Sequence, residues 1–269
     1  MADIPYLPRS MRGGDLPEAI AHSLESDLLT ALGRDEIQVL FQPQVSCETG
    51  VITGAEALAR WHHPSLGEVG ARDLFAIAER ASLVAPLSRH IVARALDMAA
   101  DWPQSMRLSL NITPEELAES NFAASFVDVV ARSKFNADRL TLEITEDILL
   151  TDMDFAAREL GTLNTAGFRI ALDDFGAGFC NFGYLKTLPL DVIKLDRSMV
   201  EGIASDERDL EVLRAIVALC KALDLDVVAE GIETEGQLAV VTQEGCSLWQ
   251  GFLRSEPIAP DAMLELARG

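Results

Sequence analysis

Polar side chains recur along this 269-residue chain at or near the carboxyl-terminal ends of short apolar segments. A single residue of this kind indicates little, because strands commonly end in polar residues where they reach solvent. Here seven successive segments share the feature, and four of them supply five carboxylates. The residues are Glu56, Asn111, Glu143, Asp173 with Asp174, Lys194, Glu230 and Gln250.

These residue types predict a site for divalent metal ions. Clustered carboxylates repel one another and stay partly protonated unless cations compensate them. Carboxylate and carboxamide oxygens suit Mg²⁺ or Mn²⁺, and no His or Cys set with zinc-ligand spacing accompanies them. Two ions ~3.5–4 Å apart assist in-line displacement at phosphorus, and the adjacent Asp173 and Asp174 offer a bridging carboxylate. Lys194 would orient the attacking water or neutralise transition-state charge.

The elements that position these residues are short strands alternating with helices. The predicted strands are 37–41, 51–58, 106–112, 139–145, 168–174, 191–196, 226–231 and 246–251, and the predicted helices include 85–101, 122–134, 153–166, 208–223 and 234–243. This alternation predicts an α/β fold of the TIM-type (β/α)₈ barrel, whose strand ends converge on one face. A doubly wound open sheet is the alternative, although no GxGxxG follows the first strand.

The amino-terminal segment differs from the rest in composition. Residues 1–14 carry two prolines and a Gly-Gly pair and predict a linker or domain junction, with the barrel domain spanning 15–269. An amphipathic helix follows, with Leu16, Ile20, Leu24, Leu28 and Leu32 on one stripe and Gly33 at its end. Two capping boxes, at Thr113 and Thr234, predict helix starts.

Composition bounds the class of protein. Lysine and arginine number 22 against 43 acidic residues, a net charge of −21, so nonspecific binding to duplex nucleic acid is excluded. The 49% of hydrophobic residues excludes a disordered acidic tail. We find no signal peptide and no apolar run near 18 residues, which predicts a cytoplasmic domain, free-standing or cut from a larger protein. The four cysteines form no CxxC pair and are expected to be reduced thiols.

The segment 173–185, DDFGAGFCNFGYL, combines three glycines with three phenylalanines. The glycines allow unusual backbone conformations and the aromatic rings can anchor the loop. A plain surface turn does not need three aromatic residues. We therefore predict a lid over the active site.

These blocks together resemble the EAL-type cyclic di-GMP phosphodiesterases, bacterial enzymes that linearise cyclic di-GMP to 5′-pGpG. The motif that names the family, Glu56-Ala57-Leu58, lies in GAEALARW (54–61) and follows FQPQV (41–45). Six further blocks follow in family order: LNITP (110–114), LEITED (142–147), DDFGAGF (173–179), LPLDVIKLD (188–196), AEGIET (229–234) and WQGF (249–252). The resemblance covers roughly residues 20 to 266. It implies a barrel with one antiparallel strand, two Mg²⁺ or Mn²⁺ ions, inhibition by Ca²⁺ and a homodimer.

The resemblance also implies roles for individual residues. Lys194, Glu230 and Glu56 match catalytic residues, and Glu146 matches the glutamate that supports the lid loop. The implied metal ligands or water-positioning groups are Glu56, Asn111, Glu143, Asp173, Asp174 and Glu230. The implied substrate contacts are Gln42, Leu58, Arg60, Asn111, Asp196, Glu233 and Gln250. The sequence departs from the family pattern at Cys180, Asn181 and Phe182, which bears on lid dynamics and dimer coupling.

Three alternatives remain open from the sequence. The same fold could be a receptor that binds cyclic di-GMP without cleaving it, although such members typically lack several metal ligands and none is missing here. Lys194 could form a Schiff base, as in an aldolase. It could also pair with Asp196 or the carboxylates for structural reasons alone. An upstream regulatory or GGDEF-type domain is expected in a full-length parent, and direct membrane insertion is not.

Overall fold

The structure, a computed structural model, describes residues 18–34, 36–146, 152–178 and 183–268. Its contacts divide the chain into two compact units. The first comprises Met1–Leu40 and Leu58–Ala95, and the second comprises Phe41–Ala57 and Leu96–Gly269. The predicted linker 1–14 lies outside the described residues, and the prediction of one domain over 15–269 stays a prediction.

Eight strands form a closed barrel, six of them wholly within the second unit; the start of β1 and the end of β2 belong to the first unit. Their order around the barrel is β1-β9-β8-β7-β6-β5-β4-β2, and a β1–β2 pairing closes it. The strands are β1 (Ile37–Ser46), β2 (Ile52–His63), β4 (Arg107–Asn111), β5 (Leu140–Thr145), β6 (Arg169–Phe175), β7 (Val192–Leu195), β8 (Asp226–Ala229) and β9 (Leu248–Trp249). All eight predicted strands are confirmed in place, β1 and β2 being longer than expected.

One strand runs against the others, as the resemblance implied. β1 is antiparallel to β9, whereas the barrel pairings β2–β4, β4–β5, β5–β6, β6–β7, β7–β8 and β8–β9 are all parallel. The cause is the short connection between β1 and β2, where Ser46 N–H donates to Val51 O and Gly50 has a φ of 68°. A turn this short joins only antiparallel strands, because a parallel pair needs a crossover of a dozen or more residues.

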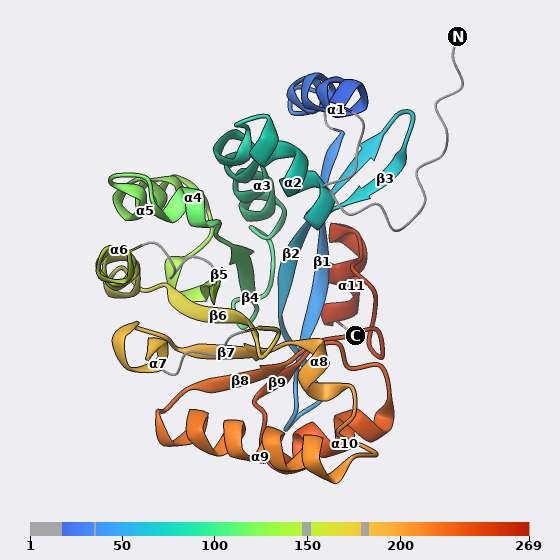
Figure 1. Ribbon diagram of the computed structural model, residues 1–269, viewed down its shortest axis with the longest axis vertical. Helices are drawn as coiled ribbons and strands as arrows, with labels where there is room; N and C mark the ends of the chain where they lie inside the picture. The colour runs from blue at the N-terminus through green and yellow to red at the C-terminus, as the bar shows by residue number, and fades with distance from the viewer. Residues whose placement is uncertain (1–17, 35, 147–151, 179–182, 269) are drawn as a thin grey trace. The chain divides into compact units, whose positions relative to one another are not determined.

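Helices in the second unit follow the parallel strands and lie along their outer side (Figure 1). They are α4 (Pro114–Leu117), α5 (Phe122–Arg132), the 3₁₀ helix η1 (Ala137–Arg139), α6 (Met153–Thr165), α7 (Tyr184–Thr187), α8 (Arg197–Val200), α9 (Glu207–Ala222), α10 (Glu235–Glu244) and α11 (Pro260–Arg268). The two predicted capping boxes are confirmed: Thr113 and Glu116 cap α4, and Thr234 and Gln237 cap α10. No helix in the described ranges is long and apolar enough to span a bilayer.

Two layers of side chains fill the barrel interior, because every second residue of a strand faces inward. The polar layer lies toward the carboxyl ends of the parallel strands and consists of Glu56, Asn111, Glu143, Asp173, Lys194, Glu230 and Gln250. Glu56 itself lies inside β2, at the last residue of its parallel pairing with β4. Two residues earlier on each strand lies the second layer: Gly54, Ser109, Thr141, Ala171, Val192, Val228 and Leu248. Ala171, Val192, Val228 and Leu248 pack together as an apolar floor. This apolar floor lies beneath part of the polar layer.

The first unit contains α1 (Glu18–Ala31), β3 (Gly67–Gly70), α2 (Ala71–Arg80) and most of α3 (Val84–Met98). α1 confirms the predicted amphipathic helix, with Leu24 and Leu28 buried. β3 pairs with the end of β2 from His63↔Gly67 to Arg60↔Gly70 and was not predicted. Neither was α2, whose segment lacks a side-chain N-cap.

Candidate active site

Four carboxylates surround the ammonium group of Lys194, as expected from strand ends that converge. The lysine is 1% exposed and comes from β7, the sixth of the eight barrel strands in chain order. The distances from Nζ are 2.6 Å to Glu143 Oε2, 2.9 Å to Asp173 Oδ1, 2.9 Å to Glu230 Oε1 and 3.4 Å to Glu56 Oε2. Within the described ranges, every ion pair of these four carboxylates is with Lys194. One positive charge thus faces four acidic groups.

Two carboxamides orient the carboxylates from the side. Asn111 Nδ2 donates to Glu56 Oε1 over 2.9 Å. Gln250 Nε2 donates to Glu56 Oε2 over 2.9 Å and to Glu230 Oε1 over 2.8 Å. Both oxygens of Glu56 are therefore held in fixed directions, since the residue is only 5% exposed.

The pKa values of these groups follow from burial and mutual repulsion. Burial, with the charges of Glu56 and Asp173, raises the pKa of Glu143 well above its ordinary value. Burial raises the pKa of Glu230 to about 8 despite the attraction of Lys194. For Glu56, burial raises the pKa, but Lys194 and the amide donors outweigh it and hold the pKa low. Burial lowers the pKa of Lys194, but the surrounding carboxylates raise it well above the ordinary value.

The donor set fits divalent cations, with Asp173 common to two groups. Oxygens of Glu56, Glu143 and Asp173 all lie within 4.8 Å of one another, and so do those of Asp173, Asp174 and Glu230. In the described part of the chain, Glu143 Oε1 is buried without a hydrogen-bond partner. A buried oxygen without a donor is costly unless a cation or proton takes that place. These oxygens are the ligands that Mg²⁺ and Mn²⁺ prefer.

A backbone irregularity brings the consecutive Asp173 and Asp174 to the same side. Successive residues of a regular strand point to opposite faces. Asp174 has a φ of 54°, and the β6–β7 register shifts between Leu172 and Phe175. This conformation, strained for a residue with a side chain, lets both carboxylates approach Glu230. Burial and the neighbouring charge of Asp173 raise the pKa of Asp174.

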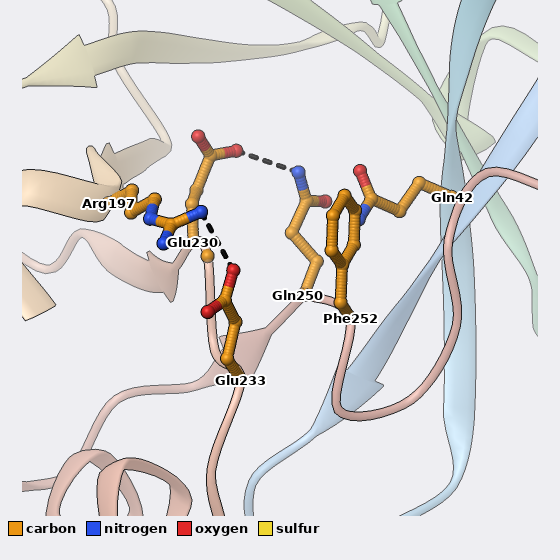
Figure 2. A pocket seen from close by; sticks show the side chains of 8 residues that line it. Gln42, Arg197, Glu230, Glu233, Gln250 and Phe252 are labelled. Carbon is orange, nitrogen blue, oxygen red and sulfur yellow. Dashed lines mark hydrogen bonds and ion pairs between the residues drawn. The ribbon is translucent and has the colours of Figure 1, made fainter. Parts of the chain in front are cut away.

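A cavity of about 190 Å³ opens beside the carboxylates. Figure 2 shows Arg197 and Glu233 on one side, Phe252 and Gln42 on the other, and Gln250 between them. Arg197 Nη1 lies 2.7 Å from Glu233 Oε1, and Phe252 is 55% exposed. The cavity thus combines an exposed aromatic ring with one guanidinium, two carboxyl groups and two amides, and it includes the predicted residues Gln42, Glu230, Glu233 and Gln250.

The remaining predicted residues lie elsewhere or have other contacts. Asp196 caps α8 by accepting from Ser198 N–H over 2.9 Å. Leu58 and Arg60 belong to the first unit, where Arg60 Nε lies 3.7 Å from Glu68 Oε1. The predicted substrate contacts of Asp196, Leu58 and Arg60 stay predictions.

Part of the predicted lid lies outside the described residues, including Cys180, Asn181 and Phe182 with Phe179. In the described part, Phe175 is buried and Gly176 has a φ of 100°. Glu146 follows the end of β5 and is partly buried. Its support of the lid stays a prediction. Cys47, Cys220 and Cys246 carry free thiols, as expected.

Sequence reasoning missed four residues of this region. Arg197 and Phe252 line the cavity, and Gln44 and Ser109 extend the polar layer inward. A signal existed for Gln44, because it lies two positions after Gln42 on one strand and so faces the same way. Arg197 and Glu233 lie on different strand–helix connections, so no local sequence pattern predicts that they pair.

Curated relatives support the resemblance. The EAL domain family profile matches residues 25–257 of this chain. A cyclic di-GMP phosphodiesterase of Pseudomonas aeruginosa, PA2567, is 33% identical over 258 residues, 94% of this chain and 44% of the relative. The uncharacterized protein y4lL of Sinorhizobium fredii is 33% identical over 245 residues, 91% of this chain and 30% of the relative. The chain therefore spans less than half the length of these curated relatives.

Solved structures agree with the barrel described above. The EAL enzyme Bd1971, in its form with cAMP and cyclic di-GMP bound, superimposes with a TM-score of 0.87 at 30% identity, covering 95% of this chain and 71% of that one. The PaMucR phosphodiesterase in complex with c-di-GMP gives 0.84 at 32% identity, covering 90% of this chain and 100% of that one. Sequence profile, fold and strand-end residues converge: the chain belongs to the EAL domain family.

Proposed function

We propose that this chain hydrolyses one phosphodiester bond of cyclic di-GMP and releases linear 5′-pGpG. The observation that carries the proposal is the set of two carboxylate groups that share Asp173 and enclose Lys194. The relative PA2567 is named as a cyclic di-GMP phosphodiesterase, and PaMucR is a phosphodiesterase whose structure contains c-di-GMP. A receptor that only binds the dinucleotide would not need this complete set of donors.

In this proposal the carboxylates and Asn111 hold two divalent cations, Mg²⁺ or Mn²⁺. Glu56, Glu143 and Asp173 supply one group of oxygens, and Asp173, Asp174 and Glu230 supply the other. Bound cations of this kind neutralise phosphate charge and make water a stronger acid. They would also relieve the excess negative charge that Lys194 alone leaves uncompensated.

The protein's own groups then act on water and on the phosphorus. The water oxygen forms a new P–O bond, the P–O3′ bond breaks, and the 3′-oxygen takes up a proton from solvent. Glu230, at the edge of the cavity, accepts the proton that the water loses. The Lys194 ammonium donates hydrogen bonds to the attacking oxygen and stabilises the charge that develops on the phosphate.

We propose that the cavity beside the carboxylates holds one guanine. A guanine edge offers N–H donors, which suit the Glu233 carboxylate, and acceptors at O6 and N7, which suit the Arg197 guanidinium. The exposed ring of Phe252 offers a face for stacking. Gln42 and Gln250 complete the polar lining.

Further properties stay proposals because the chain spans only part of its relatives. They include a homodimer, an upstream regulatory or GGDEF-type domain, and substrate contacts by Leu58, Arg60 and Asp196. Arg60 would serve as a phosphate ligand through its planar guanidinium.

The direct test incubates the purified protein with cyclic di-GMP and Mg²⁺ or Mn²⁺, and follows pGpG by chromatography. We expect pGpG with either ion and none after EDTA treatment, with recovery when Mn²⁺ is restored. Binding of cyclic di-GMP without cleavage would favour a receptor instead. Trapping of Lys194 by borohydride with a carbonyl substrate would favour the Schiff-base chemistry.

A further inference from the structure

A chain of buried polar side chains leads from the carboxylates down into the second layer of the barrel. Gln250 is 4% exposed, Gln44 is 5% exposed and Ser109 is 2% exposed. Gln44 Nε2 lies 3.2 Å from Gln250 Oε1 and 3.3 Å from Ser109 Oγ. Ser109 and Thr141 are the two polar residues of this layer, and the other five are apolar or glycine. Burying an extra amide there is unfavourable unless its hydrogen bonds are made.

The direction of the Gln250 amide follows from its neighbours. Glu56 and Glu230 present carboxyl oxygens to it at 2.9 and 2.8 Å, and the ionised carboxylate of Glu56 only accepts. The Nε2 end of Gln250 must therefore face the carboxylates, and its Oε1 end must face away from them. Gln44 supplies the donor that Oε1 needs at this buried position.

We propose that Gln44 is a positioning residue that acts through Gln250. Its N–H group holds the Gln250 amide in the one orientation that donates to both carboxylates. Without it, a half-turn of the Gln250 amide would place Oε1 against two carboxylate oxygens. Glu56 and Glu230 would then lose the donors that aim them at a cation. Ser109 has the same role one step further away, by holding Gln44.

The inference rests on the proposed function for its effect on hydrolysis, but its effect on cation binding can be measured without any substrate. Residues that support metal ligands from behind typically change metal affinity ~10–100-fold when they are replaced. We therefore expect Gln44→Met to weaken Mn²⁺ binding by roughly tenfold or more in calorimetry. Methionine has a similar length and cannot donate, so the substitution removes the hydrogen bond with little change in volume.

A double-mutant cycle separates positioning from general damage. If Gln44 acts only through Gln250, the Gln44→Met, Gln250→Met double variant binds Mn²⁺ no more weakly than Gln250→Met alone. Thr141→Val is the matched control, because Thr141 pairs in register with Ser109 in the same layer and makes no hydrogen bond to this amide chain. We expect the control to bind Mn²⁺ as the wild type does. Thermal denaturation establishes that each variant is folded.

Two results would overturn the proposal. One is a folded Gln44→Met protein with wild-type Mn²⁺ affinity. The other is a double variant whose loss of Mn²⁺ affinity equals the product of the losses in the two single variants. Should Gln44→Met fail to fold, Ser109→Ala takes its place in the same cycle, with a smaller loss expected and the same two results counting against it. A wild-type protein that binds Mn²⁺ but does not cleave cyclic di-GMP would contradict the proposed function and leave the Gln44 result standing. If the wild type cleaves cyclic di-GMP and Gln44→Met keeps the wild-type Mn²⁺ affinity, the positioning role of Gln44 is contradicted and the proposed function is not.

Discussion

Acidic side chains at the two ends of the barrel strands differ in how fully their charge is compensated. At the carboxyl ends, four carboxylates share the single ammonium group of Lys194. At the amino ends, Asp226 and Asp191 each have hydrogen-bond donors of their own. Asp226 receives hydrogen bonds from Arg169 at 2.5 Å and from Ser247 at 2.8 Å, and Asp191 receives them from Asn164 and the Ile170 backbone.

This difference indicates which end of the barrel binds cations. The amino end is balanced and half-exposed, since the side chain of Asp226 is 45% exposed and that of Arg169 is 24% exposed. The carboxyl end is buried and carries excess negative charge, which is unfavourable without further protons or cations. A stable fold gains nothing from that excess, whereas a cation-dependent site requires it.

The largest expected effect follows from removing the shared ammonium group. Lys194→Ala should lower the rate of pGpG formation at least ~100-fold, the usual loss for one preorganised electrostatic group. Binding of cyclic di-GMP in Ca²⁺ should change little, because this group acts mainly in the transition state. Arg169→Met at the amino end is the control and should keep the wild-type rate. A Lys194→Ala protein with a near wild-type rate would remove the lysine from the mechanism.

A second comparison removes one carboxylate from each end. Glu56→Ala should abolish most turnover. It should weaken Mn²⁺ binding without abolishing it, because Glu143 and Asp173 of the same oxygen group remain. Asp226→Asn should leave Mn²⁺ binding unchanged. Calorimetry with Mn²⁺ on both proteins measures the difference. Equal affinities for the two variants would contradict the assignment of the carboxyl end as the cation site.

The rate of hydrolysis at the carboxyl end should depend on which cation is bound. Ca²⁺ should bind the carboxylates but support little hydrolysis, because its longer and looser coordination misplaces the attacking water. Rates of pGpG formation in Mg²⁺, Mn²⁺ and Ca²⁺, measured beside calorimetric affinities, test this. Full activity in Ca²⁺ alone would rule out the proposed dependence on coordination geometry.

The pH dependence of stability should have opposite signs at the two ends. Glu230 in the cation-free protein has its pKa raised from 4.5 to about 8, mainly by burial. Its contribution to the free energy of unfolding is therefore full below pH 4.5 and is lost as the pH rises through 8. For Asp226, burial raises the pKa, but the hydrogen bonds from Arg169 and Ser247 outweigh it and lower the pKa. Its contribution is present above about pH 4 and is lost as the pH falls further.

Urea unfolding in EDTA at a series of pH values measures the free energy of unfolding and so tests this prediction. Between pH 5 and 8 the wild type should lose stability, by an amount on the order of a few kcal/mol from Glu230. Glu230→Gln should flatten that slope, whereas Asp226→Asn should flatten only the slope below pH 4. A wild-type stability that rises from pH 5 to 8 would contradict the sign assigned to the carboxyl end.

Much of the barrel could be predicted from sequence because its signals are local. Apolar segments ending in Asn111, Glu143, Asp173 and Lys194 each lie at or near a strand end, and convergence at one face follows from the fold class. Glu56 differs, because β2 continues past it to His63. The capping boxes at Thr113 and Thr234 mark helix starts for the same reason. The short strand β3 and helix α2 were missed, since Gly67–Gly70 lacks an apolar alternation and α2 lacks a side-chain cap.

What the sequence did not reveal depends on distant pairs. Gln44 and Gln250 lie 206 residues apart, and only the closed barrel brings their amides together. The orientation of Asp174 depends on a positive φ that no local pattern around it predicts. The pairing of Arg197 with Glu233 likewise depends on how two separate loops meet. Such contacts are set by tertiary packing, which periodicity and motif spacing do not describe.

Anomalous diffraction from crystals grown with Mn²⁺ tests most directly whether the carboxyl end of the barrel holds cations around Asp173. We predict two anomalous peaks that share Asp173 as a ligand, one beside Glu56 and Glu143 and the other beside Asp174 and Glu230. Peaks confined to the amino end near Asp226, or no peak beside Asp173 in crystals saturated with Mn²⁺, would contradict the account.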